Sequence, residues 1–61
     1  MLVELVDEKR ASELVGINLT TLQFFRRRGS GPAFVKLGRL IRYRIADIED
    51  WIDKNLNVAP T

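Results

Sequence analysis

The sequence predicts a mainly α-helical domain with one small β-hairpin: three short helices, with a two-stranded wing between the second and the third. Three observations predict this arrangement. Capping residues and glycines delimit two short helices that are almost contiguous. A run of alternating apolar and basic residues follows a loop that contains glycine and proline, and an amphipathic segment comes last. At 61 residues, the chain has room for one domain with a small core.

The first helix is expected over residues 8–15. Asp7 is a good N-cap, because its carboxylate can accept hydrogen bonds from backbone N–H groups of the first turn. Val6 and Ala11 have the spacing of a hydrophobic staple around that cap. Gly16 then supplies a left-handed residue, which ends the helix.

The second helix is expected over residues 19–28. A single residue, Ile17, separates the glycine that ends the first helix from the next N-cap, Asn18. Ile17 and Leu22 repeat the staple, and Gly29 ends the helix. Two short helices joined by a turn of this length form a helix-turn-helix, so the domain is a winged helix-turn-helix.

The wing is expected from two strand-like runs, residues 34–37 and 41–45. A two-residue turn would place apolar and arginine side chains on the same face. A three-residue loop, residues 38–40, pairs Leu37 with Ile41 and separates the two kinds of side chain. One face would then carry Val35, Leu37, Ile41, Tyr43 and Ile45, and the other Phe34, Lys36, Arg42 and Arg44.

The third helix is expected over residues 47–56, with acidic residues in its first turn, where the helix dipole stabilises anions. Its apolar stripe, which should face the core, consists of Ile48, Trp51, Ile52 and Leu56. We expect residues 1–61 to form a single winged helix-turn-helix domain, with 1–5 as an apolar N-terminal arm and 57–61 as a tail. The arm could fold back as a strand, or it could exchange with a neighbouring subunit.

The charges are unevenly distributed along the chain, although the formal net charge is only +2. Between Leu14 and Ala46 there is no acidic residue, and all eight acids lie outside this stretch. A one-sided basic field is typical of proteins that bind nucleic acid, whereas a solvated charged surface is the alternative. The cations of the stretch are Arg26, Arg27, Arg28, Lys36, Arg39, Arg42 and Arg44.

The sequence contains no cysteine and no histidine. Disulfides, zinc-finger ligands, the commonest general base and the thiol nucleophile are therefore excluded. We expect no enzymatic activity, no catalytic residue, no metal site and no cofactor. Because no apolar run is long enough to cross a bilayer, we also expect a cytoplasmic protein without a membrane or a small-molecule ligand as partner.

The second helix should lie in the major groove of DNA, with the wing along the backbone. Gln23 could pair with adenine, whereas Arg27 and Arg28 suit phosphates better than bases. Thr21 could instead serve only the start of the helix, and Arg26 could be a cation on its flank. The wing cations should follow phosphates, and Arg39 should reach toward the minor groove. The expected DNA-binding residues are Thr20, Thr21, Gln23, Phe24, Arg27, Arg28, Lys36, Arg39, Arg42 and Arg44.

Four aromatic or apolar residues need separate interpretation. Tyr43 and Trp51 fall on inward stripes, so they belong to the core rather than to a base-stacking surface. Leu19 and Phe24 are large apolar residues on the outer side of the second helix, where each could touch a thymine methyl group or a partner protein.

The chain resembles the excisionase-type helix-turn-helix family, which consists of MerR-like winged helices common in phages and mobile elements. The resemblance is carried by residues 6–18, 21–22, 31–39, 41–44 and 47–52, and most specifically by Val35-Lys36-Leu37-Gly38-Arg39 and Arg42-Tyr43-Arg44. It implies a recombination directionality factor that binds adjacent sites, bends DNA and steers an integrase toward excision. The implied partners are double-stranded DNA, neighbouring copies of the protein and an integrase, in the cytosol of a bacterial host. Phe24 departs from the family, whose members often have a polar or basic residue there.

Two other functions use the same fold. A small prophage-type transcriptional regulator would bind an operator with the same residues. An interaction adaptor would bind protein instead of DNA, and it predicts that changing Arg27 and Arg39 to glutamate leaves function intact.

Overall fold

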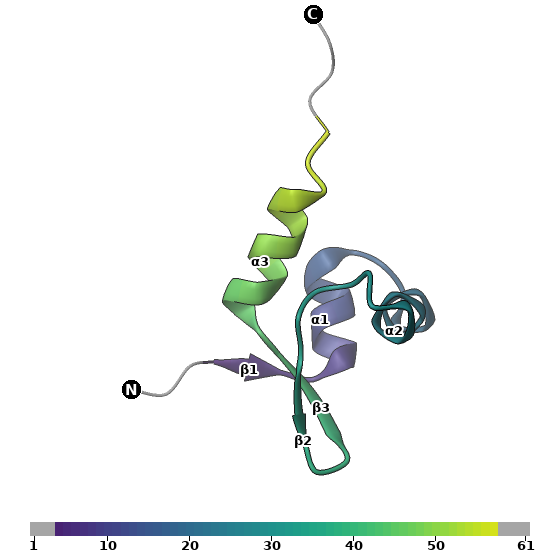
Figure 1. Cartoon of the computed structure of the whole chain (residues 1–61), viewed down its shortest axis with the longest axis vertical. Coiled ribbons are helices and arrows are strands. Elements are labelled where there is room, and N and C mark those ends of the chain that lie inside the picture. Colours follow the sequence, from purple (N-terminus) through teal and green to yellow (C-terminus); the bar gives the residue numbers. More distant parts are fainter. Residues whose placement is uncertain (1–3, 58–61) are drawn as a thin grey trace, which may run out of the picture.

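The computed structural model describes residues 4–57, which contain three helices and a three-stranded antiparallel sheet (Figure 1). The elements in chain order are β1 (Leu5–Val6), α1 (Glu8–Val15), α2 (Leu19–Arg28), β2 (Val35–Leu37), β3 (Leu40–Arg44) and α3 (Ile45–Lys54). Residues 1–3 of the expected arm and 58–61 of the expected tail lie outside the described residues. The arrangement is that of a small winged helix-turn-helix domain.

The helix-turn-helix has the caps and bounds that the sequence predicts. The carboxylate of Asp7 accepts a hydrogen bond from the Arg10 backbone N–H at 2.8 Å. The side chain of Asn18 accepts one from the Thr21 N–H, also at 2.8 Å. Gly16, with a φ of 85°, ends α1 in the left-handed conformation, which glycine adopts without steric cost. The predicted bounds of both helices are confirmed.

The sheet has the strand order β1-β3-β2, so β3 is its central strand. β1 pairs antiparallel with β3, with Leu5 opposite Arg44 and Val6 opposite Tyr43. This end of the apolar arm therefore folds back as a strand, the first of the two expected alternatives, and it adds a third strand to the predicted two-stranded wing. Val6 lies on the face of β3 that carries the buried Tyr43, and it packs against the core.

The predicted register of the wing is wrong. β2 pairs with β3 so that Val35 is opposite Arg42 and Leu37 is opposite Leu40, which leaves a two-residue turn. The turn consists of Gly38, with a φ of 62°, and Arg39. A positive φ at the first of two turn residues is the geometry that glycine favours in a tight hairpin. The preference of glycine for this turn therefore decides the register of the hairpin, even though the resulting register places apolar and basic side chains on the same face.

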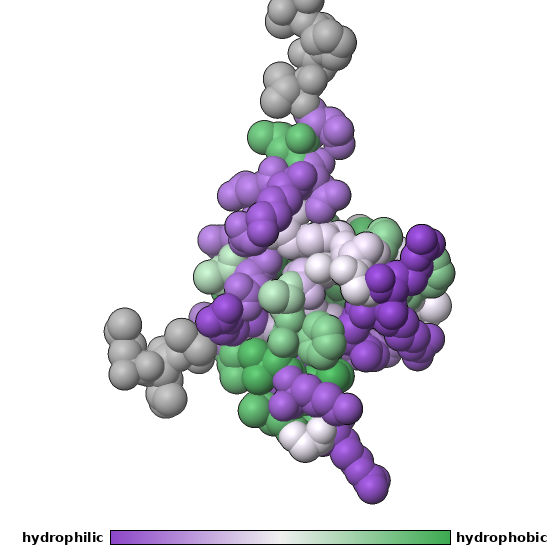
Figure 2. All heavy atoms as spheres, in the orientation of Figure 1, coloured by the Kyte–Doolittle hydropathy of each residue, from purple (hydrophilic) through white to green (hydrophobic). Residues whose placement is uncertain are grey.

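The observed register changes which side chains share a face, because side chains alternate along a strand. Tyr43 is fully buried, and Phe34 lies on its side of the hairpin, with the two ring centres 6.3 Å apart. The outer face of the hairpin is mixed rather than purely cationic, and hydrophobic side chains are visible over this region in Figure 2. This outer face carries Val35, Leu37, Leu40 and Arg42, whereas Lys36, which was expected to share a face with Arg42, lies on the side of Ile41 and Tyr43.

Helix α3 begins at Ile45, two residues before the predicted start, and ends at Lys54. Ile45 is thus the first residue of a helix and not part of a strand. Ile48 is buried, but Ile52 is exposed and Leu56 is 72% exposed beyond the helix. The predicted apolar stripe is therefore correct for its first half only, because α3 extends past the small body that it packs against (Figure 1).

The core forms where α1 meets the other elements. Helix α1 contacts α2, β3 and α3, and it lies between α2 and α3 in Figure 1. The buried apolar residues are Ala11, Leu22, Tyr43 and Ile48, surrounded by Val6, Val15, Ile17, Ile41 and Ile45. Within residues 4–57, no helix has the length and apolarity needed to cross a membrane.

Candidate nucleic-acid interface

The inner face of α2 is held by packing against the core and against α3. Leu22 is fully buried. The ring of Phe25 lies 5.7 Å from that of Trp51, and the Trp51 indole N–H donates a hydrogen bond to the Ser30 carbonyl at 2.8 Å. Trp51 therefore contacts both the helix and the loop after it, but it is half-buried and lies outside the buried core, so the prediction that it belongs to the core is only partly correct. The opposite face of α2 is exposed to solvent.

The outer face of α2 carries the residues that the sequence assigns to DNA contact. Thr20, Phe24, Arg27 and Arg28 are exposed, whereas Thr21 and Gln23 are half-buried; Leu19 is exposed as well. Thr21 also donates its backbone N–H to the N-cap, so it serves the start of the helix. The guanidinium of Arg28 lies over the Phe24 ring, 5.2 Å from its centre.

Arg26 is separated from this surface by an ion pair that the sequence does not reveal. Its Nε donates to a Glu8 carboxylate oxygen at 2.6 Å, and the hydroxyl of Tyr43 donates to the same oxygen at 3.1 Å. The Arg26 and Glu8 side chains are only 21% and 14% exposed. The hydrogen bond to Glu8 raises the pKa of the Arg26 guanidinium. Arg26 thus joins α2 to α1 and β3, and it is not a solvated cation on the flank.

Tyr43 is the buried member of this cluster. Its removal from water raises the pKa of the Tyr43 hydroxyl to about 12, and the neighbouring Glu8 carboxylate acts in the same direction. A neutral hydroxyl can donate its hydrogen bond to Glu8, whereas a phenolate would repel it. The prediction that Tyr43 belongs to the core is confirmed.

The cations of the wing differ in their surroundings. Lys36 and Arg39 are exposed, and Arg39 lies in the turn. Arg42 is half-buried, and it donates to the carbonyl of its neighbour Ile41 at 2.8 Å. Arg44 makes a two-pronged ion pair with Asp47, at 2.6 and 2.9 Å, and this hydrogen bonding raises its pKa. Arg44 therefore differs from the other predicted wing cations, because Asp47 of the same domain balances its charge.

Apart from Lys9 on α1, the ion pairs divide the basic residues of the described chain into two groups. Within residues 4–57, the paired cations are Arg10, Arg26, Arg44 and Lys54. The cations of the basic stretch that form no ion pair in this part of the chain are Arg27, Arg28, Lys36, Arg39 and Arg42. They lie on the exposed part of α2 and on the hairpin, where Figure 2 shows hydrophilic side chains over α2 and at the hairpin end.

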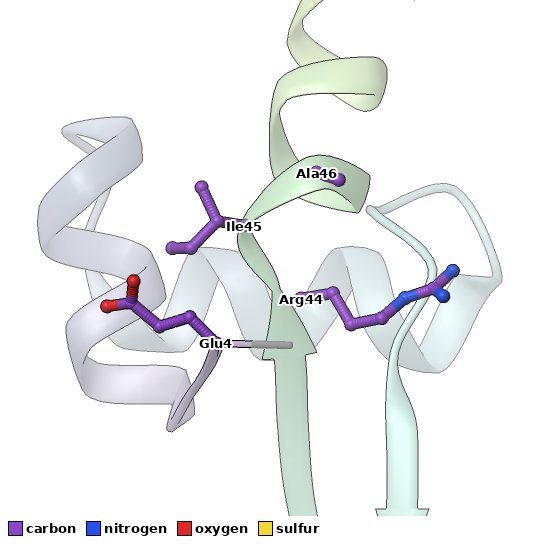
Figure 3. Close-up of a pocket in the computed structure, with 4 residues that line it drawn as sticks. All are labelled: Glu4, Arg44, Ile45 and Ala46. Carbon is purple, nitrogen blue, oxygen red and sulfur yellow. The ribbon is translucent and has the colours of Figure 1, made fainter. Parts of the chain in front are cut away.

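A shallow pocket lies away from this surface, where the chain before β1 meets the start of α3. It is lined by Glu4, Arg44, Ile45 and Ala46 (Figure 3). The Arg44 side chain extends away from Glu4 in this view, and its guanidinium is engaged by Asp47. The lining therefore combines one acid, one arginine that is already paired with Asp47, and two apolar residues, and it does not add an unpaired cation to the basic surface.

Comparison with known proteins agrees with the fold. A family model described as a helix-turn-helix domain matches residues 5–56, a range that includes every helix and strand of the structure. A search of curated proteins gave no match. A helix-turn-helix domain indicates binding to double-stranded DNA, with its second helix in the major groove. The chain belongs to the family of helix-turn-helix domains.

Proposed function

We propose that this protein is an excisionase-type DNA-binding protein, which binds adjacent sites on double-stranded DNA, bends the DNA and steers an integrase toward excision. The observation that carries the DNA-binding part is the division of the cations. Within residues 4–57, the cations of the basic stretch that form no ion pair lie on α2 and the hairpin, the two elements that a winged helix-turn-helix applies to DNA.

In the proposed complex, α2 occupies the major groove. A helix with its side chains is about 10–12 Å across, and the groove is about 12 Å wide, so one helix fits. Thr20, Gln23 and Phe24 would face base edges, while Arg27 would reach a phosphate. Thr21 would support the helix start and could add a backbone contact.

The hairpin would lie along the backbone beside α2. Lys36 and Arg42, which the observed register places on opposite faces of the hairpin, would each contact a phosphate, and Arg39 in the turn would reach toward the minor groove. Arg44 could contact a phosphate only by leaving Asp47, so its contribution is expected to be the smallest of the wing cations.

The excisionase part of the proposal is supported by the sequence resemblance and by the size of the contact. A single module of this size buries roughly 600–1,000 Å² on DNA, which gives modest affinity for one site. Adjacent copies on neighbouring sites would gain affinity together. Cooperative binding is therefore the behaviour expected of such a domain on repeated sites.

The test is a gel-shift titration with DNA that flanks the attachment site of the genetic element encoding the protein, with scrambled DNA as the control. A ladder of specific, cooperative shifts with anomalous mobility, followed by integrase-dependent excision in a recombination assay, would support the proposal. A single specific complex without bending would overturn the excisionase part and identify the transcriptional regulator. The absence of any binding at low salt would overturn the DNA-binding part.

A further inference from the structure

Three exposed side chains form a row along the outer face of α2. Thr20, Phe24 and Arg28 are spaced by four residues, so they lie one above another on the helix surface. Half of Phe24 is exposed to solvent, although its neighbour Phe25 is packed against Trp51. Packing in the core therefore does not explain why a large aromatic ring lies in the middle of this row.

The second and third members of the row form a stacked pair. The Arg28 guanidinium carbon lies 5.2 Å from the centre of the Phe24 ring, within the range of a cation–π interaction. Stacking on a ring restricts a long side chain that otherwise samples many rotamers. Within residues 4–57, no acid forms an ion pair with Arg28. Its N–H donors are thus oriented and available.

A stacked phenylalanine and arginine have the chemistry of a two-part base reader. In the major groove, arginine donates two hydrogen bonds to O6 and N7 of guanine, and phenylalanine can contact the methyl group of thymine. The 5.2 Å between the two groups is more than the rise of about 3.4 Å between adjacent base pairs and less than two such steps. The ring and the guanidinium can therefore reach neighbouring base pairs.

We propose that Phe24 and Arg28 act as one specificity-determining unit, which recognises a step where a thymine methyl group lies beside the O6 and N7 edge of a guanine. The inference rests on the proposed DNA binding and deepens it. It assigns base recognition to Arg28, whose residue type and place at the end of α2 alone favour a phosphate contact. It also gives the exposed Phe24 ring a function that needs no protein partner.

The test uses the full chain and selects the preferred site from a pool of randomised DNA duplexes. Two modified forms of the selected duplex are then titrated. Replacing thymine by uracil removes the methyl group, and replacing guanine by 7-deazaguanine removes the N7 acceptor. The variants are Phe24→Ala, Phe24→Leu and Arg28→Ala, with Arg27→Ala as the matched control, because Arg27 is an adjacent exposed arginine that stacks on no ring of residues 4–57.

We expect the unmodified protein to select adjacent thymine and guanine. Uracil should weaken its binding about fourfold, as for the loss of one buried methyl group. Deazaguanine should weaken it roughly tenfold. Phe24→Ala should lose the response to uracil, and Arg28→Ala the response to deazaguanine. Phe24→Leu should keep the first response and lose part of the second, since leucine contacts a methyl group but cannot hold the guanidinium. Arg27→Ala should keep both.

Two outcomes would overturn the proposal while leaving DNA binding in place. In one, the unmodified protein binds the selected site but is insensitive to both modifications. In the other, Arg28→Ala keeps both responses and behaves like Arg27→Ala, with uniformly weaker binding to all sequences, which identifies Arg28 as a phosphate contact. Failure of the unmodified protein to bind any duplex would overturn the proposed function itself.

Discussion

At the scale of single residues, the cluster of Glu8, Arg26 and Tyr43 decides how firmly α2 is attached. These residues come from α1, α2 and β3, and one carboxylate accepts hydrogen bonds from both of the others. Because the cluster is largely shielded from water, each polar group depends on its partners. The recognition helix is therefore anchored by a polar cluster as well as by Leu22.

Replacing Glu8 by alanine tests this anchor. The change leaves the Arg26 guanidinium and the Tyr43 hydroxyl without their acceptor, and we expect the free energy of unfolding to fall by about 1–3 kcal/mol. The matched control is Glu13→Ala, which removes an ion pair to Arg10 whose side chains are both more than half exposed. That change should cost about 0.5 kcal/mol or less. Urea denaturation measures both, and equal effects would refute the anchoring role.

Tyr43 gives a second prediction at this scale, because it is the only tyrosine in the chain. Its pKa is raised to about 12 in the folded protein, by burial first and by Glu8 second, from a usual value of about 10. Between pH 10 and 12 the unfolded chain loses this proton before the folded one, so the free energy of unfolding should decrease as pH rises. Tyrosinate absorption reports the titration directly. A midpoint near 10 in the folded protein would contradict the burial of the hydroxyl.

At the scale of elements, the sequence predicts what local chemistry determines. Asp7, Gly16, Asn18 and Gly29 set the ends of α1 and α2 through contacts within a few residues, and the structure has both helices at the predicted bounds. The hairpin register was mispredicted, because amphipathic pattern and turn chemistry disagree there and the turn prevails at Gly38. The amphipathic pattern and the turn preference of Gly38 can both be recognised in the sequence, but the sequence does not show which of the two is stronger.

Gly38 is therefore the residue on which the wing depends. Gly38→Ala should reduce the free energy of unfolding by about 1 kcal/mol, because alanine resists a positive φ. An added Cβ would meet no atom within 4 Å, so the cost is conformational and not a steric clash with the rest of the fold. D-Alanine at the same position of a synthetic chain should be tolerated, because it favours a positive φ. If both alanines were equally destabilising in urea denaturation, this explanation of the turn would be wrong.

The candidate interface was only partly predictable at this scale. The basic stretch was visible in the sequence, but the partners of its cations were not, because Arg26 meets Glu8 across 18 positions of the chain. Arg44 and Asp47 are three residues apart, a spacing that permits a pair in a helix, but the predicted strand placed Arg44 outside one. Which arginines remain available for DNA therefore depends on the tertiary structure.

The salt dependence of DNA binding distinguishes the two groups of arginine. Arg39→Ala should reduce the slope of the logarithm of the binding constant against the logarithm of salt concentration by about 0.9, as for one lost phosphate contact. Arg44→Ala should change the slope less, because Asp47 already balances its charge. Fluorescence anisotropy with a labelled duplex measures both. A larger effect for Arg44 than for Arg39 would contradict the assignment.

At the scale of the whole molecule, the fold separates its charges. The basic surface follows α2 and the hairpin, whereas α3 carries Glu49, Asp50 and Asp53 and leaves the body in a direction opposite to the hairpin (Figure 1). This separation would orient the domain on a polyanion before any specific contact forms. One face of the molecule would meet DNA, and α3 would point away from it.

The central claim, that α2 and the hairpin contact DNA together, is tested most directly by mapping amide chemical shifts by NMR during titration with a duplex. We predict that the amide chemical shifts of residues in α2 and in the β2–β3 hairpin change together, at the same DNA concentration. The amide chemical shifts of residues 49–54 in α3 should remain unchanged. Changes centred on α3, or no changes at low salt, would contradict this account.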